Sequence, residues 1–223
     1  MLPPLDRWCG ALFRFVTVAI VMMCFALAYQ DEIVNGLLPL FRAWFDLVDD
    51  TYRTLDLSVI SSNGESMVRR LATPGSLQIV AGMMVYPDST MQFSEQATTG
   101  MVLQPQILAI ALLFGWPWRN LRDLTVRLVL AVAPLTLAML LDVPTMLYGF
   151  AWFDELKAMN SNQSSFLVSW SDAMNAGGRF ALAQIAVFVS VWIGEAISSR
   201  LARRGRKVAV NEVTIAPSAL GPS

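Results

Sequence analysis

Polar side chains that could bind a polar ligand stand beside three apolar runs of the sequence. Thr98 and Thr99 precede one run, Asp142 lies late in the next, and Asn175 precedes the last. If the runs are helices that cross a membrane in alternating directions, all these positions lie near one membrane face. A carboxylate inside a membrane helix is costly, so Asp142 is a functional-site candidate by default. Gln104 completes the predicted binding site. Thr98, Asp142 and Asn175 are also the candidates for catalysis.

Two acidic residues also have purely structural interpretations. Asp142 can hydrogen-bond polar groups at the membrane surface, or it can cap a helix that Pro144 breaks. Glu195 lies close in the sequence to Arg200, and the predicted topology puts it near the 119–127 turn. This arrangement favours an ion pair at the inner surface over a role as a proton relay.

The residue types that are missing exclude several classes of chemistry. The chain has no histidine, which removes the usual acid–base group near neutral pH and the commonest metal ligand. Cys9 and Cys24 lie in one apolar run, roughly 22 Å apart along a helix and too far for a disulfide. A net charge of −1 disfavours a nucleic-acid partner. The sequence therefore predicts no metal, no cofactor and no nucleic acid.

The composition predicts that these residues are carried by membrane helices. Of the 223 residues, 55 % are hydrophobic and 15 % are charged, whereas soluble domains carry about 25 % charged residues. Apolar runs at residues 8–29, 101–118, 124–150 and 180–197 predict four spans. The expected fold class is an all-α integral membrane protein of about four transmembrane helices, with the lipid bilayer as its solvent.

The segment between the first and second spans has a different pattern. Residues 33–47 carry apolar residues at helical spacing with charges among them, which predicts an amphipathic helix on the outer membrane surface. Apolar and polar residues then alternate around 55–59, 77–79 and 91–93, and Asn63-Gly64 and Pro74-Gly75 supply turn residues. We therefore expect a small β-containing extracytoplasmic segment between about residues 54 and 96.

The basic residues predict the topology. Lys and Arg accumulate on the cytoplasmic side of membrane proteins, and the basic residues at positions 7, 14, 119, 122, 127 and 200–207 fall on one side of the predicted spans. Both termini are then cytoplasmic in the inner (plasma) membrane of a bacterium, with the first span a retained anchor or, alternatively, a cleaved signal peptide. The expected parts are an anchor (1–30), an extracytoplasmic segment (31–100), a three-helix membrane core with an outer loop at 151–176 (101–198), and a basic, disordered tail (199–223).

Small residues recur along the fourth predicted span. Ala186, Ser190 and Gly194 fall four residues apart, on one face of a helix. Such a stripe lets a second helix approach closely. It predicts a contact with another helix, including one from a membrane protein partner.

The order of these features over residues 90–195 resembles the exosortase/archaeosortase family of membrane-embedded, cysteine-dependent transpeptidases. The segment 91–100, Met-Gln-Phe-Ser-Glu-Gln-Ala-Thr-Thr-Gly, has the same spacing as the family's Ala-Cys-Ser-Gly motif, and Ala97 and Gly100 match its first and last residues. Thr98 stands where the family has its nucleophilic cysteine. The family's arginine and histidine would fall near 141–145 and 172–175, where this chain has neither. The resemblance therefore implies a relative that has lost catalysis.

Three functions remain open at this point. The first is a non-enzymatic inner-membrane protein that binds a partner or polypeptide segment at its outer face, within an envelope or protein-sorting system. The second is a divergent exosortase-like enzyme in which Thr98 is a nucleophile aided by Asp142. The third is a small transporter or channel subunit, which the clustering of polar residues at one face disfavours.

Overall fold

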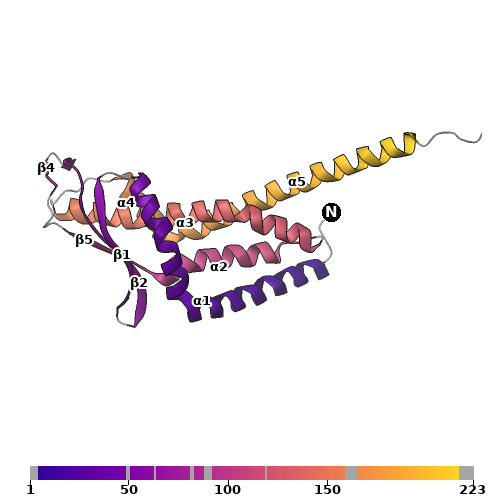
Figure 1. Ribbon diagram of the computed structural model, residues 1–223. Coiled ribbons are helices and arrows are strands. Elements are labelled where there is room, and N and C mark those ends of the chain that lie inside the picture. The colour runs from indigo at the N-terminus through magenta and orange to yellow at the C-terminus, as the bar shows by residue number, and fades with distance from the viewer. Residues whose placement is uncertain are drawn as a thin grey trace, which may run out of the picture.

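The chain forms an elongated bundle of helices that carries a small antiparallel sheet at one end, here called the sheet end (Figure 1). The computed structural model describes residues 5–48, 51–62, 64–80, 83–87, 92–118, 120–158 and 165–215. Helix α1 (Leu5–Val48) begins and helix α5 (Arg179–Ile215) ends away from the sheet, at the other end of the bundle (Figure 1).

Helix α1 (Leu5–Val48) consists of two arms that meet at Tyr29, whose backbone is non-helical (φ −127°, ψ 22°). Figure 1 shows the second arm turning sharply across the sheet end. The two helices that the sequence predicts at 8–29 and 33–47 are thus arms of one kinked helix. In the second arm Val34, Phe41 and Phe45 share one face and are buried against the sheet and α3. Protein covers the apolar face that the sequence predicts to lie on a membrane surface.

The sheet contains β1 (Tyr52–Ser62), β2 (Glu65–Pro74) and β5 (Phe93–Thr98) in the order β1-β2-β5, all antiparallel. Gly64, with φ +82°, turns the chain between β1 and β2 in a conformation that favours glycine. The prediction of strands between 54 and 96 is confirmed. The central strand β2 was not identified individually, because its apolar residues are interrupted by Arg69 and Arg70. Asn63 and Met91 lie outside the described residues.

A second, two-stranded hairpin pairs β3 (Gln78–Val80) with β4 (Met83–Val85). The remaining helices are α2 (Thr99–Gly115), α3 (Leu121–Ala158), α4 (Phe166–Ala173), the π-helical turn η1 (Met174–Gly178) and α5 (Arg179–Ile215).

Within the described residues, three stretches of helix are long and apolar enough to span a membrane: Cys9–Val48, Leu121–Lys157 and Phe166–Ile197. The second predicted span, 101–118, corresponds to α2, which is apolar but has only 17 residues. At 1.5 Å per residue it is about 26 Å long, short of a hydrocarbon core of about 30 Å. The described residues therefore provide three helices that could span a membrane and one shorter apolar helix, and four membrane spans stay a prediction.

Two segments predicted to be irregular are partly helical. In the expected outer loop 151–176, α3 continues to Ala158 and α4 fills Phe166–Ala173; residues 159–164 lie outside the described residues. In the expected disordered tail, α5 continues to Ile215, and residues 216–223 are not described. Periodicity alone gave no signal there, because these segments mix polar and apolar residues.

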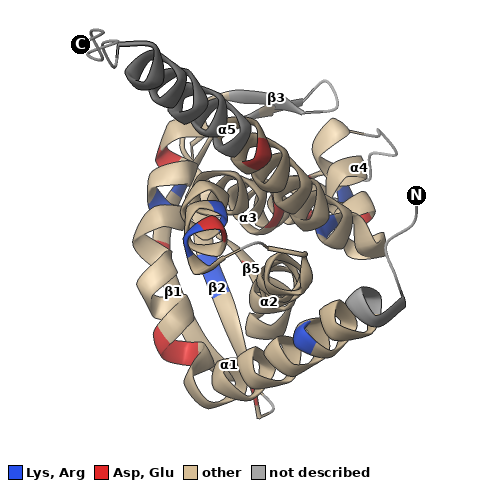
Figure 2. Cartoon of the chain, turned by 90° about the vertical axis from the view of Figure 1, so that its right-hand side faces the viewer, with Lys and Arg blue, Asp and Glu red and all other residues tan. Residues whose placement is uncertain are grey.

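Helix α2 lies between α1 and the pair formed by α3 and α5 (Figures 1 and 2). A Cβ atom at Gly115 would come within 2.9 Å of Phe15 Cβ, so glycine permits α1 and α2 to approach closely there. Most residues in Figure 2 are uncharged. A charge buried among them is costly unless another group pairs with it, so the surroundings of each buried charge are described below.

Candidate functional site

Arg179 lies at the junction between η1 and α5 and is buried, with 6 % of its surface exposed. Its Nε donates to the backbone oxygen of Met174 (3.1 Å), and its Nη2 donates to Asn175 Oδ1 (2.9 Å) and to Met146 Sδ (3.1 Å). Asp142 Oδ1 lies 3.9 Å from Nε. These five residues are referred to below as the Arg179 site.

The local backbone explains how η1 meets Arg179. Gly177 has φ +110°, a conformation that side chains rarely adopt, so the glycine permits the break between α4 and α5. A Cβ atom at Gly178 would come within 2.7 Å of the Ala173 backbone oxygen, so this position also has no room for a side chain. The break brings the Met174 carbonyl and the Asn175 amide to the guanidinium. Irregular turns of this type are frequent at functional sites.

Pro144 shapes the part of α3 that carries Asp142. Proline has no backbone N–H, so the carbonyl of Leu140 loses its usual i+4 donor. The hydroxyl of Thr145 donates to that carbonyl instead (3.3 Å). This replacement keeps the backbone satisfied beside Asp142 in a helix that could span a membrane.

Helix α4 is held against this part of α3 by side-chain hydrogen bonds. The indole Nε1 of Trp170 donates to the Leu141 carbonyl (2.9 Å). Ser171 Oγ lies 3.2 Å from the Met146 carbonyl and 3.0 Å from the Leu167 carbonyl, and its one proton serves either acceptor. A Cβ atom at Gly149 would overlap Ser171 Oγ. The absence of a side chain at Gly149 therefore lets α4 sit close to α3 and positions η1.

The charges of the site are incompletely satisfied by the described chain. Asp142 is 3 % exposed, and its Oδ1 has no hydrogen-bond partner among the described residues. The hydrogen bonds of Arg179 to described residues use Nε and Nη2 and leave Nη1 unused. The buried acceptor lies 3.9 Å from Nε of the guanidinium that carries the unused donor. A peptide unit or carboxamide, which carries one donor and one acceptor, matches this pair.

The structure brings two of the sequence-predicted candidates, Asp142 and Asn175, to the same guanidinium. Arg179 itself was missed, because it stands next to an apolar run and resembles a flanking charge. The signal that could have identified it is the pair Gly177-Gly178 directly before it, since this pair predicts a helix break rather than a continuous span.

Thr98, Thr99 and Gln104 have other surroundings. Thr98 caps α2, and its Oγ1 accepts from the backbone N–H of Met101 (3.3 Å). The hydroxyl of Thr99 lies 2.9 Å from Gln30 Oε1 and 3.1 Å from the Ser66 carbonyl, so it links the kink of α1 to β2. Gln104 is exposed on α2. Within the described residues, no hydrogen bond joins any of the three to the Arg179 site. Their participation in one pocket with Asp142 and Asn175 stays a prediction.

At the opposite end of the bundle, the structure confirms an ion pair for Glu195. Arg127 Nη2 lies 3.0 Å from Asp123 Oδ2 and 3.9 Å from Glu195 Oε1, and its Nη1 donates to the Pro117 carbonyl (3.1 Å). The guanidinium thus joins the end of α2 to α3 and α5. Of the other predicted partners, Arg119 lies outside the described residues, and the side chain of Arg200 is not described.

The small-residue stripe of α5 is buried in the chain. Ala186 and Ser190 are buried, and a Cβ atom at Gly194 would come within 3.2 Å of Arg127 Cγ. At Gly194 the stripe therefore receives α3 of the same molecule. Contact of the stripe with another membrane protein stays a prediction. Cys9 and Cys24 are both free and exposed on α1.

Comparisons with protein-family models, with curated proteins and with solved structures gave no match to this chain.

Proposed function

We propose that this chain is a polytopic protein of the bacterial inner membrane that binds an extended polypeptide segment at the Arg179 site without cleaving it. The observation that carries the proposal is the pairing of an unused donor, Arg179 Nη1, with an unsatisfied buried acceptor, Asp142 Oδ1. A buried polar group that lacks a partner costs about 1–3 kcal/mol, and more if it is charged. A ligand that supplies both partners recovers this free energy on binding.

The orientation in this proposal places the sheet outside the cell. The three long apolar helices would cross the bilayer, and α2 would do so where the bilayer is thinned or its ends are covered. Both termini would be cytoplasmic, because the arginines and lysine at 200–207 follow α5's apolar part directly. The Arg179 site, on the sheet side of these helices, would then face the outer surface.

Photo-crosslinking in intact cells tests the binding function. A photoreactive phenylalanine derivative is placed at Asp172, which is exposed on α4 close to the site. We expect a crosslinked polypeptide adduct that falls at least tenfold, a cost of about 1.4 kcal/mol, in Arg179→Gln and Asp142→Asn. Arg69→Gln is the matched control, because Arg69 forms a half-exposed ion pair with Asp56 on the sheet. An adduct of equal yield in all variants would contradict the proposal.

The transpeptidase alternative is distinguished by Thr98. A threonine nucleophile needs a base to accept its proton, but the Oγ1 of Thr98 accepts a hydrogen bond from Met101 and makes no hydrogen bond with a described acidic or basic side chain. The binding proposal expects the adduct to survive Thr98→Val at unchanged yield. If the wild type also gives an adduct with a cleaved, shorter polypeptide, and Thr98→Val gives only the adduct with the intact polypeptide, the result would favour the enzyme instead.

A further inference from the structure

A second group of buried charges lies under the sheet, apart from the Arg179 site. On the covered face of the sheet, Val68, Arg70 and Ala72 of β2 pair with Ala97, Glu95 and Phe93 of β5. Arg70 is 1 % exposed and Glu95 is 3 % exposed. An arginine and a glutamate therefore face each other in the middle of an otherwise apolar face.

Arg70 is held by groups other than Glu95. Its Nε donates to Thr54 Oγ1 (3.1 Å) on β1, and its Cζ lies 4.0 Å from the centre of the Phe45 ring on α1. The aromatic face stabilises the cation. Glu95, by contrast, forms no ion pair with a described residue, and neither of its carboxyl oxygens has a hydrogen-bond partner there.

Helix α3 brings further acidic groups to the same interior. Glu155 is fully buried, and its Oε2 accepts a hydrogen bond from the hydroxyl of Tyr52 on β1. Asp154, which is exposed, adds a negative charge close to Glu95. From α1 the covering side chain is Phe45, while Arg42 and Asp46 are exposed. The interior thus holds two buried carboxyl groups, Glu95 and Glu155, and one buried cation, Arg70.

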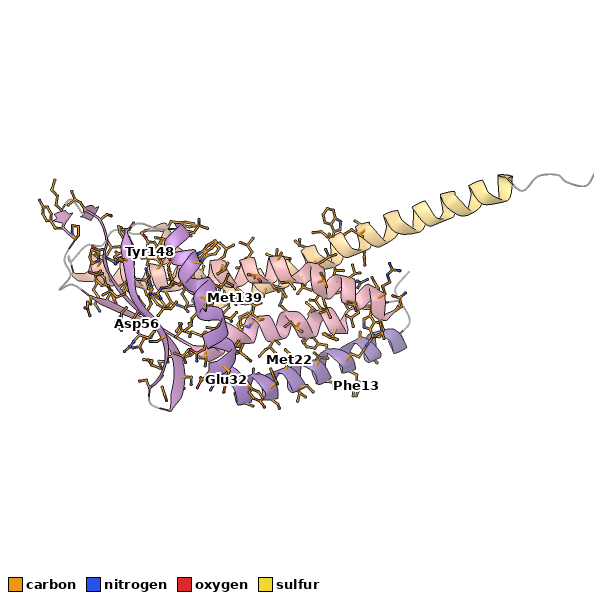
Figure 3. The ribbon with its side chains drawn as sticks, in the orientation of Figure 1. Phe13, Met22, Glu32, Asp56, Met139 and Tyr148 are labelled. Carbon is orange, nitrogen blue, oxygen red and sulfur yellow. The ribbon has the colours of Figure 1, made fainter. Side chains whose placement is uncertain are left out.

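The packing around these groups joins three parts of the protein. Tyr52 of β1 contacts both Phe93 of β5 (ring centres 5.7 Å apart) and Tyr148 of α3 (5.5 Å). Figure 3 shows Tyr148 on α3 beside the sheet, with Met139 further along the helix. A change in the charge under the sheet therefore acts on the contact between the sheet and the helices α1 and α3.

We propose that Glu95 is a proton-controlled latch, which keeps the sheet closed on α1 and α3 while its carboxyl group is protonated and loosens this contact when it ionises. A protonated carboxyl group can be buried at far lower cost than a carboxylate without hydrogen bonds. Ionisation releases one proton to the solvent and leaves, opposite Arg70, a buried carboxylate that has no hydrogen-bond partner among the described residues. Opening of the sheet lets water reach the new charge.

The acidity of Glu95 agrees with this arrangement. Burial raises the pKa of Glu95 to about 7; the positive charge of Arg70 and the nearby backbone N–H of Glu95 itself lower it only in part, and Asp154 raises it further. Glu95 belongs to β5, outside the three stretches long enough to span a membrane. The latch is independent of the proposed peptide binding, because its residues and its test do not involve the Arg179 site.

Hydrogen–deuterium exchange of the purified full chain in lipid nanodiscs tests the latch. Exchange in β5 and in residues 148–158 is measured between pH 5 and pH 8.5 and corrected for the intrinsic pH dependence of amide exchange. We expect the opening equilibrium to rise by up to about tenfold per pH unit as the pH approaches 7, and to level off above it. Glu95→Gln, which keeps the shape of the protonated acid, should remove this rise.

Two further variants keep the test decisive. Asp56→Asn is the matched control, because Asp56 is a half-exposed acid of the same sheet, and its profile should equal that of the wild type. Asp154→Asn should move the plateau to lower pH, because it removes a negative charge near Glu95. Asp154 is exposed, so this variant is expected to fold even if Glu95→Gln does not.

Infrared difference spectroscopy gives a readout that does not depend on opening. The carbonyl band of a protonated carboxylic acid should be present at pH 6, be lost by pH 8.5, and be absent from this difference in Glu95→Gln. The proposal is overturned if Asp154→Asn leaves the exchange profile unchanged, or if the wild type opens equally at pH 5 and pH 8.5.

Discussion

Each of two regions of this protein buries an arginine beside a carboxyl group, and the two arrangements differ. In the Arg179 site, oxygen and sulfur acceptors from Met174, Asn175 and Met146 fix the guanidinium, and Asp142 lies 3.9 Å away. Under the sheet, Arg70 is stacked on Phe45 and bonded to Thr54, and Glu95 forms no ion pair with a described residue. In both regions the side chains that hold the arginine are mainly uncharged.

The comparison shows that a nearby arginine does not by itself settle the state of a buried carboxyl group. Hydrogen bonds directed to the carboxylate are what stabilise its charge in a protein interior. Asp142 and Glu95 both lack such bonds to the oxygens concerned within the described chain. At the Arg179 site we propose that a ligand supplies the missing bonds, whereas under the sheet we propose that a proton does.

The largest expected effect comes from removing the cation of the Arg179 site. Arg179→Met leaves Asp142 buried without its only ion-pair partner among the described residues. Breaking a buried pair in this way typically costs about 3–5 kcal/mol. Unfolding of the purified protein in detergent measures this cost. The double variant Arg179→Met/Asp142→Leu should recover most of it, and a double variant no more stable than the single one would show that the two charges are not coupled.

A large effect is also expected where α4 meets α3. Gly149→Val introduces side-chain atoms that overlap Ser171, and overpacking of this kind costs about 1–3 kcal/mol. Since Trp170 bonds the carbonyl next to Asp142, the adduct at Asp172 should fall as well. Gly36→Val, at a position where a Cβ atom would have nothing within 4 Å, controls for loss of glycine in a helix. Equal stability of the two variants would contradict the close contact.

The third prediction concerns how the stability of the protein depends on pH through Glu95. The folded-state pKa of Glu95, about 7, lies above its ordinary value of 4.5. Its contribution to stability is therefore complete below pH 4.5 and is lost as the pH rises to 7, at no more than about 1.4 kcal/mol per pH unit. Thermal unfolding of wild type and Glu95→Gln between pH 4.5 and pH 8 measures the difference.

The pKa of Asp56, on the same sheet, is shifted in the opposite direction. A hydrogen bond from Ser58, assisted by Arg69, holds the pKa of Asp56 below its usual value. Its contribution is present above pH 3.8 and is lost as the pH falls further. Asp56→Asn should therefore leave the pH dependence of stability above pH 4.5 unchanged. If this variant instead removed that pH dependence, the effect would belong to Asp56 and not to Glu95.

The smallest effect is expected at Thr99, which belongs to neither region. Thr99→Val keeps the shape of the side chain and removes its hydrogen bond to Gln30 or Ser66. The loss should be about 1 kcal/mol, measured by unfolding, with no change in the crosslinked adduct. A strong loss of adduct at normal stability would extend the binding site to Thr99, as the sequence predicts.

Local patterns in the sequence were enough to predict the apolar helices, the strand before the turn at Gly64 and the ion pair of Glu195, and they made Asp142 a candidate for the site. Each of these follows from the length of an apolar run, from alternation along the chain, or from the isolation of a charge in an apolar segment. No local pattern predicted the kink at Tyr29 or the central strand β2. They depend on what the second arm of α1 and the sheet pack against.

Which charges meet depends on the tertiary structure. Asp142 and Arg179 are separated by 37 positions in the sequence, and they meet because Gly177 breaks the helix and Gly149 admits α4. Arg70 and Glu95 meet through the register of β2 and β5, where a shift by one residue would turn both to the other face. The pairing of buried charges depends on contacts between distant segments, and a single sequence does not specify these.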